Sequence, residues 1–165
     1  MFRIMIHKLT YLILFIVFIL GISSGCVKNE TCLSANNLMK AKFFRVESDT
    51  TITEATVDTF SMYIVGREDS VLYLNNLKLD SIGVPMADTL HHLKIVIEIN
   101  HVVDTLYLDY KPYPVFRSTE CGVINRYEIQ NLSHTSHKII DINLKNKIID
   151  ESEAVNLRML VDVDD

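Results

Sequence analysis

Alternation of apolar and polar residues dominates the chain after residue 40. In the clearest run, residues 93–100, leucine or isoleucine occupies every second position, and a second run follows at 106–110 after a short turn. Successive side chains of a β-strand point to opposite faces, so a period of two predicts half-buried strands. These two runs therefore predict a β-hairpin.

Similar runs occur on both sides of this hairpin. They lie at 41–47, 60–64, 71–74, 124–130, 138–144 and 156–163. In the run at 138–144, the expected apolar face consists of Ile140, Ile142 and Leu144. Residues 77–89 contain Gly83-Val84-Pro85 and favour a connection. Lys111-Pro112-Tyr113-Pro114 favours an edge or crossover segment, because proline has no N–H to donate to a strand ladder.

Seven to nine short strands, with turns about every ten residues and no amphipathic helix, predict an all-β domain. We expect a single β-sandwich over residues 34–165, and an immunoglobulin-like fold with Greek-key connections is one form of it. An up-and-down barrel is the alternative.

Residues 1–25 have the layout of an export signal. Arg3 and Lys8 precede an apolar run at 12–20, which ends in small residues before Cys26. This run is shorter than the about 20 residues that span a bilayer. We therefore expect residues 1–25 to be removed as a signal peptide.

The sequence before Cys26 resembles a bacterial lipobox, although Ser23 stands where leucine is commonest. Cys26 is thus the predicted lipidation site, and residues 26–33 form a lipid-anchored tether. Lipidation with more than one chain anchors a protein stably to a membrane. The expected location is the outer membrane, facing the periplasm or the cell surface. Alternatively, an ordinary signal peptidase cleaves after Gly25 and leaves a free thiol.

Two cysteines remain, Cys32 and Cys121. An even number of cysteines in an oxidising compartment predicts one disulfide between them. A reactive or metal-binding thiol is the alternative, but neither residue belongs to a Cys-x-x-Cys motif.

The charge of the chain argues against a nucleic-acid partner. Its 16 basic and 21 acidic residues become 14 and 21 when Arg3 and Lys8 leave with the signal, a net charge of −7. Proteins that bind nucleic acid need basic surfaces for the phosphates.

Histidines near two predicted turns are the candidate metal ligands, namely His91, His92, His101, His134 and His137. A zinc site needs three or four converging ligands, and solvated turn histidines are the simpler interpretation. We therefore predict no metal.

Catalytic motifs are equally sparse. Ser118 and Glu120 precede Cys121, but no Gly-x-Ser-x-Gly elbow surrounds the serine. The acidic terminus, Asp162 to Asp165, lacks the glycine and the ligand spacing of a calcium loop. We predict that the chain is not an enzyme and holds no cofactor.

Four aromatic residues lie within ten consecutive positions, around the predicted sheet edge. They are Tyr107, Tyr110, Tyr113 and Phe116. Exposed together, they would form a partner surface with polar tips. The alternative is that these rings fill the core of the sandwich.

Three short motifs carry a family resemblance: Asp-Thr-Leu-Tyr-Leu-Asp-Tyr at 104–110, Val-Phe-Arg-Ser-Thr-Glu-Cys-Gly at 115–122 and Ile-Asp-Ile at 140–142. Together with the lipobox and Cys32, they resemble an uncharacterised family of small lipoproteins from Bacteroidota. The resemblance covers the mature chain. It implies a secreted, lipid-anchored, β-rich domain and brings no known activity.

The expected function is that of a cell-envelope lipoprotein: a non-catalytic interaction or structural module. Its partners would be the membrane, through the lipid, and another envelope protein. The alternative is an accessory lipoprotein that captures a glycan or a metal for nutrient uptake.

Overall fold

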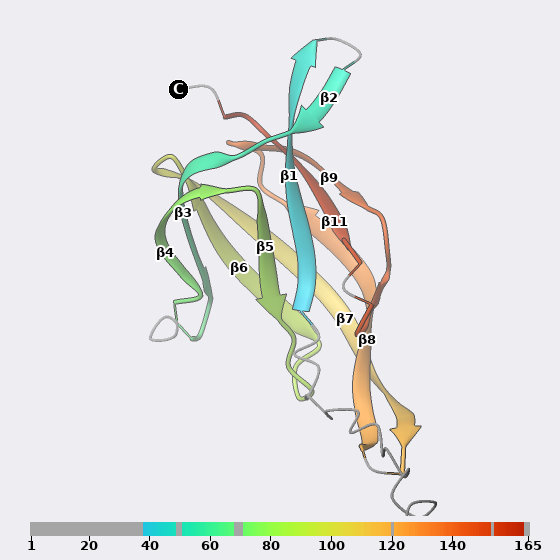
Figure 1. Cartoon of the computed structure of the whole chain (residues 1–165). Coiled ribbons are helices and arrows are strands. Elements are labelled where there is room, and N and C mark those ends of the chain that lie inside the picture. Colours follow the sequence, from blue (N-terminus) through green and yellow to red (C-terminus); the bar gives the residue numbers. More distant parts are fainter. Residues whose placement is uncertain (1–37, 49–50, 68–70, 120, 153, 164–165) are drawn as a thin grey trace, which may run out of the picture. The chain divides into compact units, whose positions relative to one another are not determined.

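In the part of the chain that the computed structural model describes, eleven strands form two sheets, and the sheets pack as a sandwich (Figure 1). The structure describes residues 38–48, 51–67, 71–119, 121–152 and 154–163. Neither sheet closes into a barrel. The predicted β-sandwich is confirmed, with eleven strands in place of seven to nine. The predicted signal and tether lie outside the described residues.

No helix in the described part of the chain is long and apolar enough to cross a membrane.

Sheet A is organised around its first strand, β1 (Leu38–Ser48). The other strands of this sheet are β2 (Thr51–Glu54), β5 (Ser81–Pro85), β9 (Ile139–Leu144) and β11 (Leu157–Val161). On one side, β1 pairs in parallel with β11, which pairs with β9. On the other side, β5 pairs with the first half of β1 and β2 with the second half.

Sheet B has the order β10-β8-β7-β6-β3-β4. Its strands are β3 (Val57–Ile64), β4 (Tyr73–Leu79), β6 (His92–Ile99), β7 (Val102–Ser118), β8 (Gly122–His134) and β10 (Ile148–Ile149). The hairpin predicted from residues 93–110 is confirmed as β6–β7. Its turn contains Asn100 and His101, whose φ angles are 48° and 64°.

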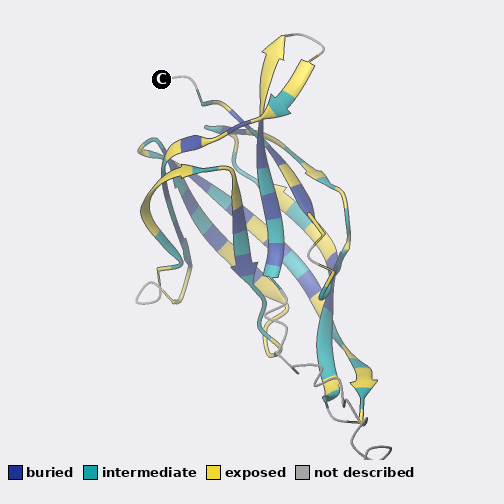
Figure 2. Ribbon diagram, in the orientation of Figure 1, coloured by how far each residue is buried: buried dark blue, intermediate teal, exposed yellow. Residues whose placement is uncertain are grey.

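The core lies between the two sheets, and every second residue along β6 and much of β7 is buried (Figure 2). Sheet A contributes the inward positions of β1, β5 and β11. The hydrophobic core residues of these five strands are Met39, Ala41, Phe43, Ile82, Val84, Leu93, Ile95, Ile97, Ile99, Leu106, Leu108, Tyr110, Leu157, Met159 and Val161.

Two expectations about local structure were wrong. Residues 77–89 do not form only a connection, because β5 lies within them and buries Ile82 and Val84. In β9 the fully buried residue is Ile139, and Ile140 is 52% exposed. The register between β9 and β11 shifts between Leu160 and Val161, which places Ile139 inward together with the partly buried Ile142.

Paired strands extend from both ends of the sandwich (Figure 1). At one end, the second half of β1 pairs with β2 to form the β1–β2 hairpin. At the other end, β7 continues beyond Asp109, its last residue paired with β6, and β8 extends beyond Tyr127, its last residue paired with β10. Residues 111–118 and 122–126 therefore form a two-stranded segment, the β7–β8 ribbon.

Candidate functional site

The four aromatic residues of the predicted partner surface do not form one surface. Tyr107 is 43% exposed, and the Lys94 ammonium lies 5.8 Å from its ring centroid. Tyr110 is only 2% exposed and packs edge-on against Tyr127, with the ring centroids 5.7 Å apart. Tyr110 thus belongs to the core, which corrects its assignment to the surface.

Strand alternation separates the remaining pair of rings as well. Along β7, Phe116 shares the inner face of sheet B with Tyr110, whereas Tyr113 lies on the outer face with Tyr107. Both Tyr113 and Phe116 belong to the β7–β8 ribbon, beyond the part of β7 that pairs with β6.

The hydroxyl groups of the two core tyrosines hold one loop. The Tyr110 hydroxyl donates to the Ala87 carbonyl oxygen at 2.9 Å, and the Tyr127 hydroxyl donates to Asp88 Oδ1 at 2.5 Å. Burial raises the pKa of both phenols, and the neighbouring Asp88 carboxylate raises the pKa of Tyr127 further. Both phenols therefore remain neutral donors that fix this loop to the sandwich.

The cysteine predictions extend beyond the described part of the chain. Cys26 and Cys32 lie outside the described residues, so lipidation and the Cys32–Cys121 bridge stay predictions. Cys121 lies in the turn of the β7–β8 ribbon, where its backbone N–H donates to Ser118 Oγ at 3.1 Å. The Ser118 hydroxyl oxygen thus stabilises a turn, and Glu120 lies outside the described residues.

The candidate histidines have separate partners. Nδ1 of His92 lies 2.6 Å from Asp109 Oδ1, and Nδ1 of His101 lies 3.4 Å from Glu98 Oε1. The His134 ring donates to the Thr135 carbonyl oxygen at 2.7 Å. Among the described residues, no three His, Cys, Asp or Glu side chains are grouped so as to hold a metal ion.

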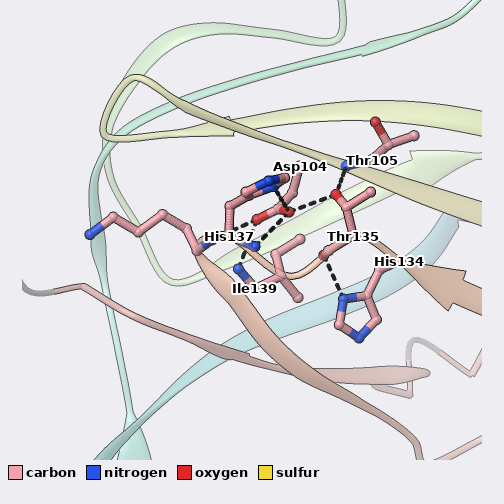
Figure 3. A network of polar contacts seen from close by, with 7 residues as sticks. Asp104, Thr105, His134, Thr135, His137 and Ile139 are labelled. Carbon is pink, nitrogen blue, oxygen red and sulfur yellow. Dashed lines mark hydrogen bonds and ion pairs between the residues drawn. The ribbon is translucent and has the colours of Figure 1, made fainter.

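Asp104 is one of two buried polar or charged residues in the described part of the chain, at 1% exposed. Figure 3 shows the polar contacts of its carboxylate. Its Oδ1 atom accepts from the Thr135 hydroxyl at 2.7 Å and from the His137 backbone N–H and Nδ1, both at 3.0 Å. Its Oδ2 atom accepts from the backbone N–H groups of Lys138 and Ile139 at 2.8 and 2.9 Å. Asp104 thus joins β7 of sheet B to the segment that crosses into sheet A.

The pKa of Asp104 reflects these contacts. Burial disfavours the charged carboxylate and acts to raise the pKa, but the hydroxyl and backbone donors outweigh it and lower the pKa to about 2. A buried carboxylate with all its contacts to fixed donors is a poor general base, because it reaches no substrate and binds a proton weakly. The Asp104 cluster is structural.

A buried amide, Asn156, connects the sheets at the opposite end. It is 2% exposed, and its Oδ1 atom accepts from the Lys40 N–H of β1 at 3.0 Å. Its Nδ2 group donates to the carbonyl oxygens of Asn146 and Ile148 at 3.2 and 2.8 Å. Asn156 thus joins β1 of sheet A to the start of β10 in sheet B and to the loop before it.

The outer face of sheet A carries the site with the strongest binding character. Phe44 on β1 lies opposite Leu160 on β11 in the strand register, and Leu160 lies opposite Asp141 on β9. The guanidinium carbon of Arg158 lies 4.5 Å from the centroid of the Phe44 ring. Phe44 therefore points away from the core and is still only 6% exposed.

A shallow depression of about 180 Å³ surrounds this pair. It is lined by Phe44, Ile52, Asp141, Asn143, Lys145, Arg158 and Leu160. Val46 and Ile52 are register partners in the β1–β2 hairpin, and they are 48% and 59% exposed. We call Phe44, Val46, Ile52, Lys145, Arg158 and Leu160 the sheet A surface.

A comparison with known protein families finds a match, which covers most of this sandwich. The model of a family of unknown function, DUF6452, matches residues 45–161. The chain belongs to the DUF6452 family. No curated protein and no solved structure matches it. The expectation of an uncharacterised family is confirmed.

The part that matches DUF6452 contains Asp104, Asn156 and Arg158, all of which sequence reasoning missed. Asp104 has a visible signal, since it occupies an inward position of the series that continues with Leu106 and Leu108. Arg158 has no comparable signal, because its contact with Phe44 joins strands far apart in the sequence. Cys26 and Cys32 precede the matched residues.

Proposed function

We propose that this DUF6452 protein is an exported bacterial lipoprotein that binds another cell-envelope protein through the sheet A surface. In this proposal Cys26 anchors the chain to the outer membrane, and the module acts without catalysis. The export pattern of residues 1–26 supports the location, and the resemblance to lipoproteins of Bacteroidota agrees with it.

The observation that carries the binding proposal is the exposed Arg158, whose guanidinium lies over the outward-facing Phe44 ring. Arginine and aromatic residues at the centre of an apolar patch are typical of binding hot spots in protein interfaces. The exposed Val46 and Ile52 extend the patch along the β1–β2 hairpin. Lys42 lies at the margin, where its ammonium is 2.6 Å from Glu54 Oε1. An apolar centre with a charged rim is the usual anatomy of such interfaces.

The open form of the surface, more than its volume, favours a protein over a small molecule. A second hollow of about 450 Å³ shares Phe44, Lys145 and Arg158 with the depression of about 180 Å³, and its volume lies within the roughly 300–1,000 Å³ of typical ligand pockets. A protein partner needs no deep pocket, because it covers a broad and nearly flat face.

Ligand capture is the second candidate. Lys145, Arg158 and Asn143 place cationic and amide groups around the depression. These groups suit an anionic saccharide. Arg158 covers the Phe44 ring that would otherwise stack on a sugar, so we rank capture below protein binding.

In vivo cross-linking of the tagged full-length protein tests the proposal. We expect one envelope protein to cross-link to the wild type and to be lost with Ile52→Asp. Val103→Asp is the matched control, since Val103 is 50% exposed on sheet B and should retain the partner. Equal cross-linking by all three proteins would contradict the assignment to sheet A. Saccharide binding lost with Arg158→Ala, without any specific cross-link, would favour capture instead.

A further inference from the structure

We propose that the tip of the β7–β8 ribbon inserts into the surface of the lipid bilayer that carries the anchor. This inference rests on the proposed lipidation of Cys26, and it assigns the ribbon a role separate from that of the sheet A surface.

The tip of the ribbon presents an apolar pair. Phe116 and Val123 are register partners, and they are 65% and 63% exposed. They lie on the face that, nearer the sandwich, carries the buried Tyr110, Tyr127 and Ile129. The inner face of sheet B therefore continues past the core, where sheet A no longer covers it.

The ribbon extends from the end of the sandwich at which β1 begins (Figure 1). Leu38, the first described residue of β1, pairs with Pro85, and the nearby Ala87 carbonyl oxygen binds the Tyr110 hydroxyl at 2.9 Å. From Tyr110 to Phe116 the ribbon extends roughly 20 Å along the strand, at about 3.3 Å per residue. The chain from Cys26 to Leu38 spans at most about 40 Å. A bilayer that holds Cys26 therefore lies within reach of the tip.

The predicted disulfide agrees with this placement. Cys121 lies in the turn of the ribbon, and Cys32 follows Cys26 closely in the sequence. The segment between Cys26 and Cys32 spans at most about 20 Å. A Cys32–Cys121 bridge would thus hold the turn close to the lipidated residue.

The charge of the ribbon suits a membrane with anionic lipids. Across residues 111–126 the sequence has three basic residues and one acid, whereas the whole chain has a net charge of −5. Basic residues beside a bilayer are attracted to anionic headgroups. The basic residues are Lys111, Arg117 and Arg126, of which Arg126 also pairs with Glu151 at 3.0 Å.

The small area of the tip favours a bilayer over a protein. A specific protein interface buries about 800 Å² on each partner, more than two side chains supply. A bilayer contact needs less area, because the anchor already holds the ribbon at high effective concentration beside the lipid. Aromatic and basic residues with apolar stems are suited to the boundary between headgroups and acyl chains.

The chain has no tryptophan, so a single introduced tryptophan reports on the tip without interference. The test uses full-length, lipidated Phe116→Trp in vesicles of phosphatidylethanolamine and phosphatidylglycerol, with and without brominated acyl chains. We expect a blue shift on reconstitution and a loss of emission with brominated lipid. Val103→Trp, at an exposed position near the opposite end of β7, is the matched control and should show neither change.

Flotation of the same vesicles, with Cys26→Ser for comparison, reports on the anchor separately. Suppose that Phe116→Trp floats through Cys26 while its tryptophan emission stays water-like and unquenched. That result would overturn the ribbon proposal and leave the lipoprotein proposal intact. A blue shift that appears without vesicles and rises with protein concentration would assign the tip to a second copy of the chain and also overturn it. Failure to float would overturn both proposals.

Discussion

Asp104 and Asn156 perform the same task at opposite ends of the sandwich with different side chains. Each is a buried polar residue that fixes a connection between the sheets, the first after β8 and the second before β11. Asp104 contacts only donors, namely one hydroxyl, one imidazole nitrogen and three backbone N–H groups. Asn156 contacts one backbone N–H and two carbonyl oxygens.

The difference shows that the backbone around each site selects the side chain. A carboxylate only accepts hydrogen bonds, whereas an amide both donates and accepts. A connection that presents only donors therefore suits aspartate, and one that presents carbonyl oxygens suits asparagine. Unmatched groups in a buried site lose their hydration without replacement, so exchanging the two residue types should harm both ends.

The largest effect should come from Asp104→Asn. The new amide directs N–H groups at backbone donors and removes the charge that several of them stabilise. We expect the free energy of unfolding to fall by about 3 kcal/mol. Urea titration of the mature domain measures it, and Asp58→Asn, at an exposed position of β3, should change stability little. A loss no greater than that of Asp58→Asn would show that the donors do not depend on the carboxylate.

The reverse exchange, Asn156→Asp, should cost about 2 kcal/mol at neutral pH, because a buried carboxylate would face two carbonyl oxygens. Burial and these oxygens would raise the pKa of the new group. The cost should therefore shrink as the pH falls and the group binds a proton. Asn143→Asp supplies the same change at an exposed position of β9. Urea titrations at several pH values compare them, and a cost independent of pH would contradict the prediction.

The contribution of Asp104 to the acid unfolding of the wild type should be of similar size. The folded pKa of Asp104 is about 2, below its ordinary value of 3.8. Stability from this group is complete above the unfolded pKa and is lost as the pH falls from about 5 to about 2, in total about 2 kcal/mol. Comparing the acid unfolding of the wild type with that of Asp104→Asn isolates this contribution. Parallel curves would assign the acid response to other carboxylates.

Much of the sandwich could be predicted from alternation, because a period of two reports directly on which face is buried. The series Leu106, Leu108, Tyr110 illustrates this, since all three residues are buried, although the aromatic cluster led us to assign Tyr110 to the surface. Phe116 continues the same parity and is exposed, since alternation does not say where the opposing sheet ends. The register shift that turned Ile140 outward is likewise a property of two strands together.

The candidate site was harder to predict. Phe44 and Arg158 meet because β1 and β11 are neighbours, and no local pattern links segments so distant in sequence. The sequence shows an aspartate at an inward position of β7. The donors to Asp104 lie in a distant segment of the chain and converge only after the sheets pack.

The parallel pairing of β1 with β11 also affects the order in which the strands can pair during folding. Ala41 pairs with Leu157, so the central ladder of sheet A joins the two ends of the domain. Closing such a long loop is slow and entropically costly, and long-range pairing of this kind delays folding. The hairpins of sheet B can form early, and β1 can pair with β2 and β5 early as well. The parallel ladder must wait for β11, so the first strand of the domain stays without this partner until β11 is in place.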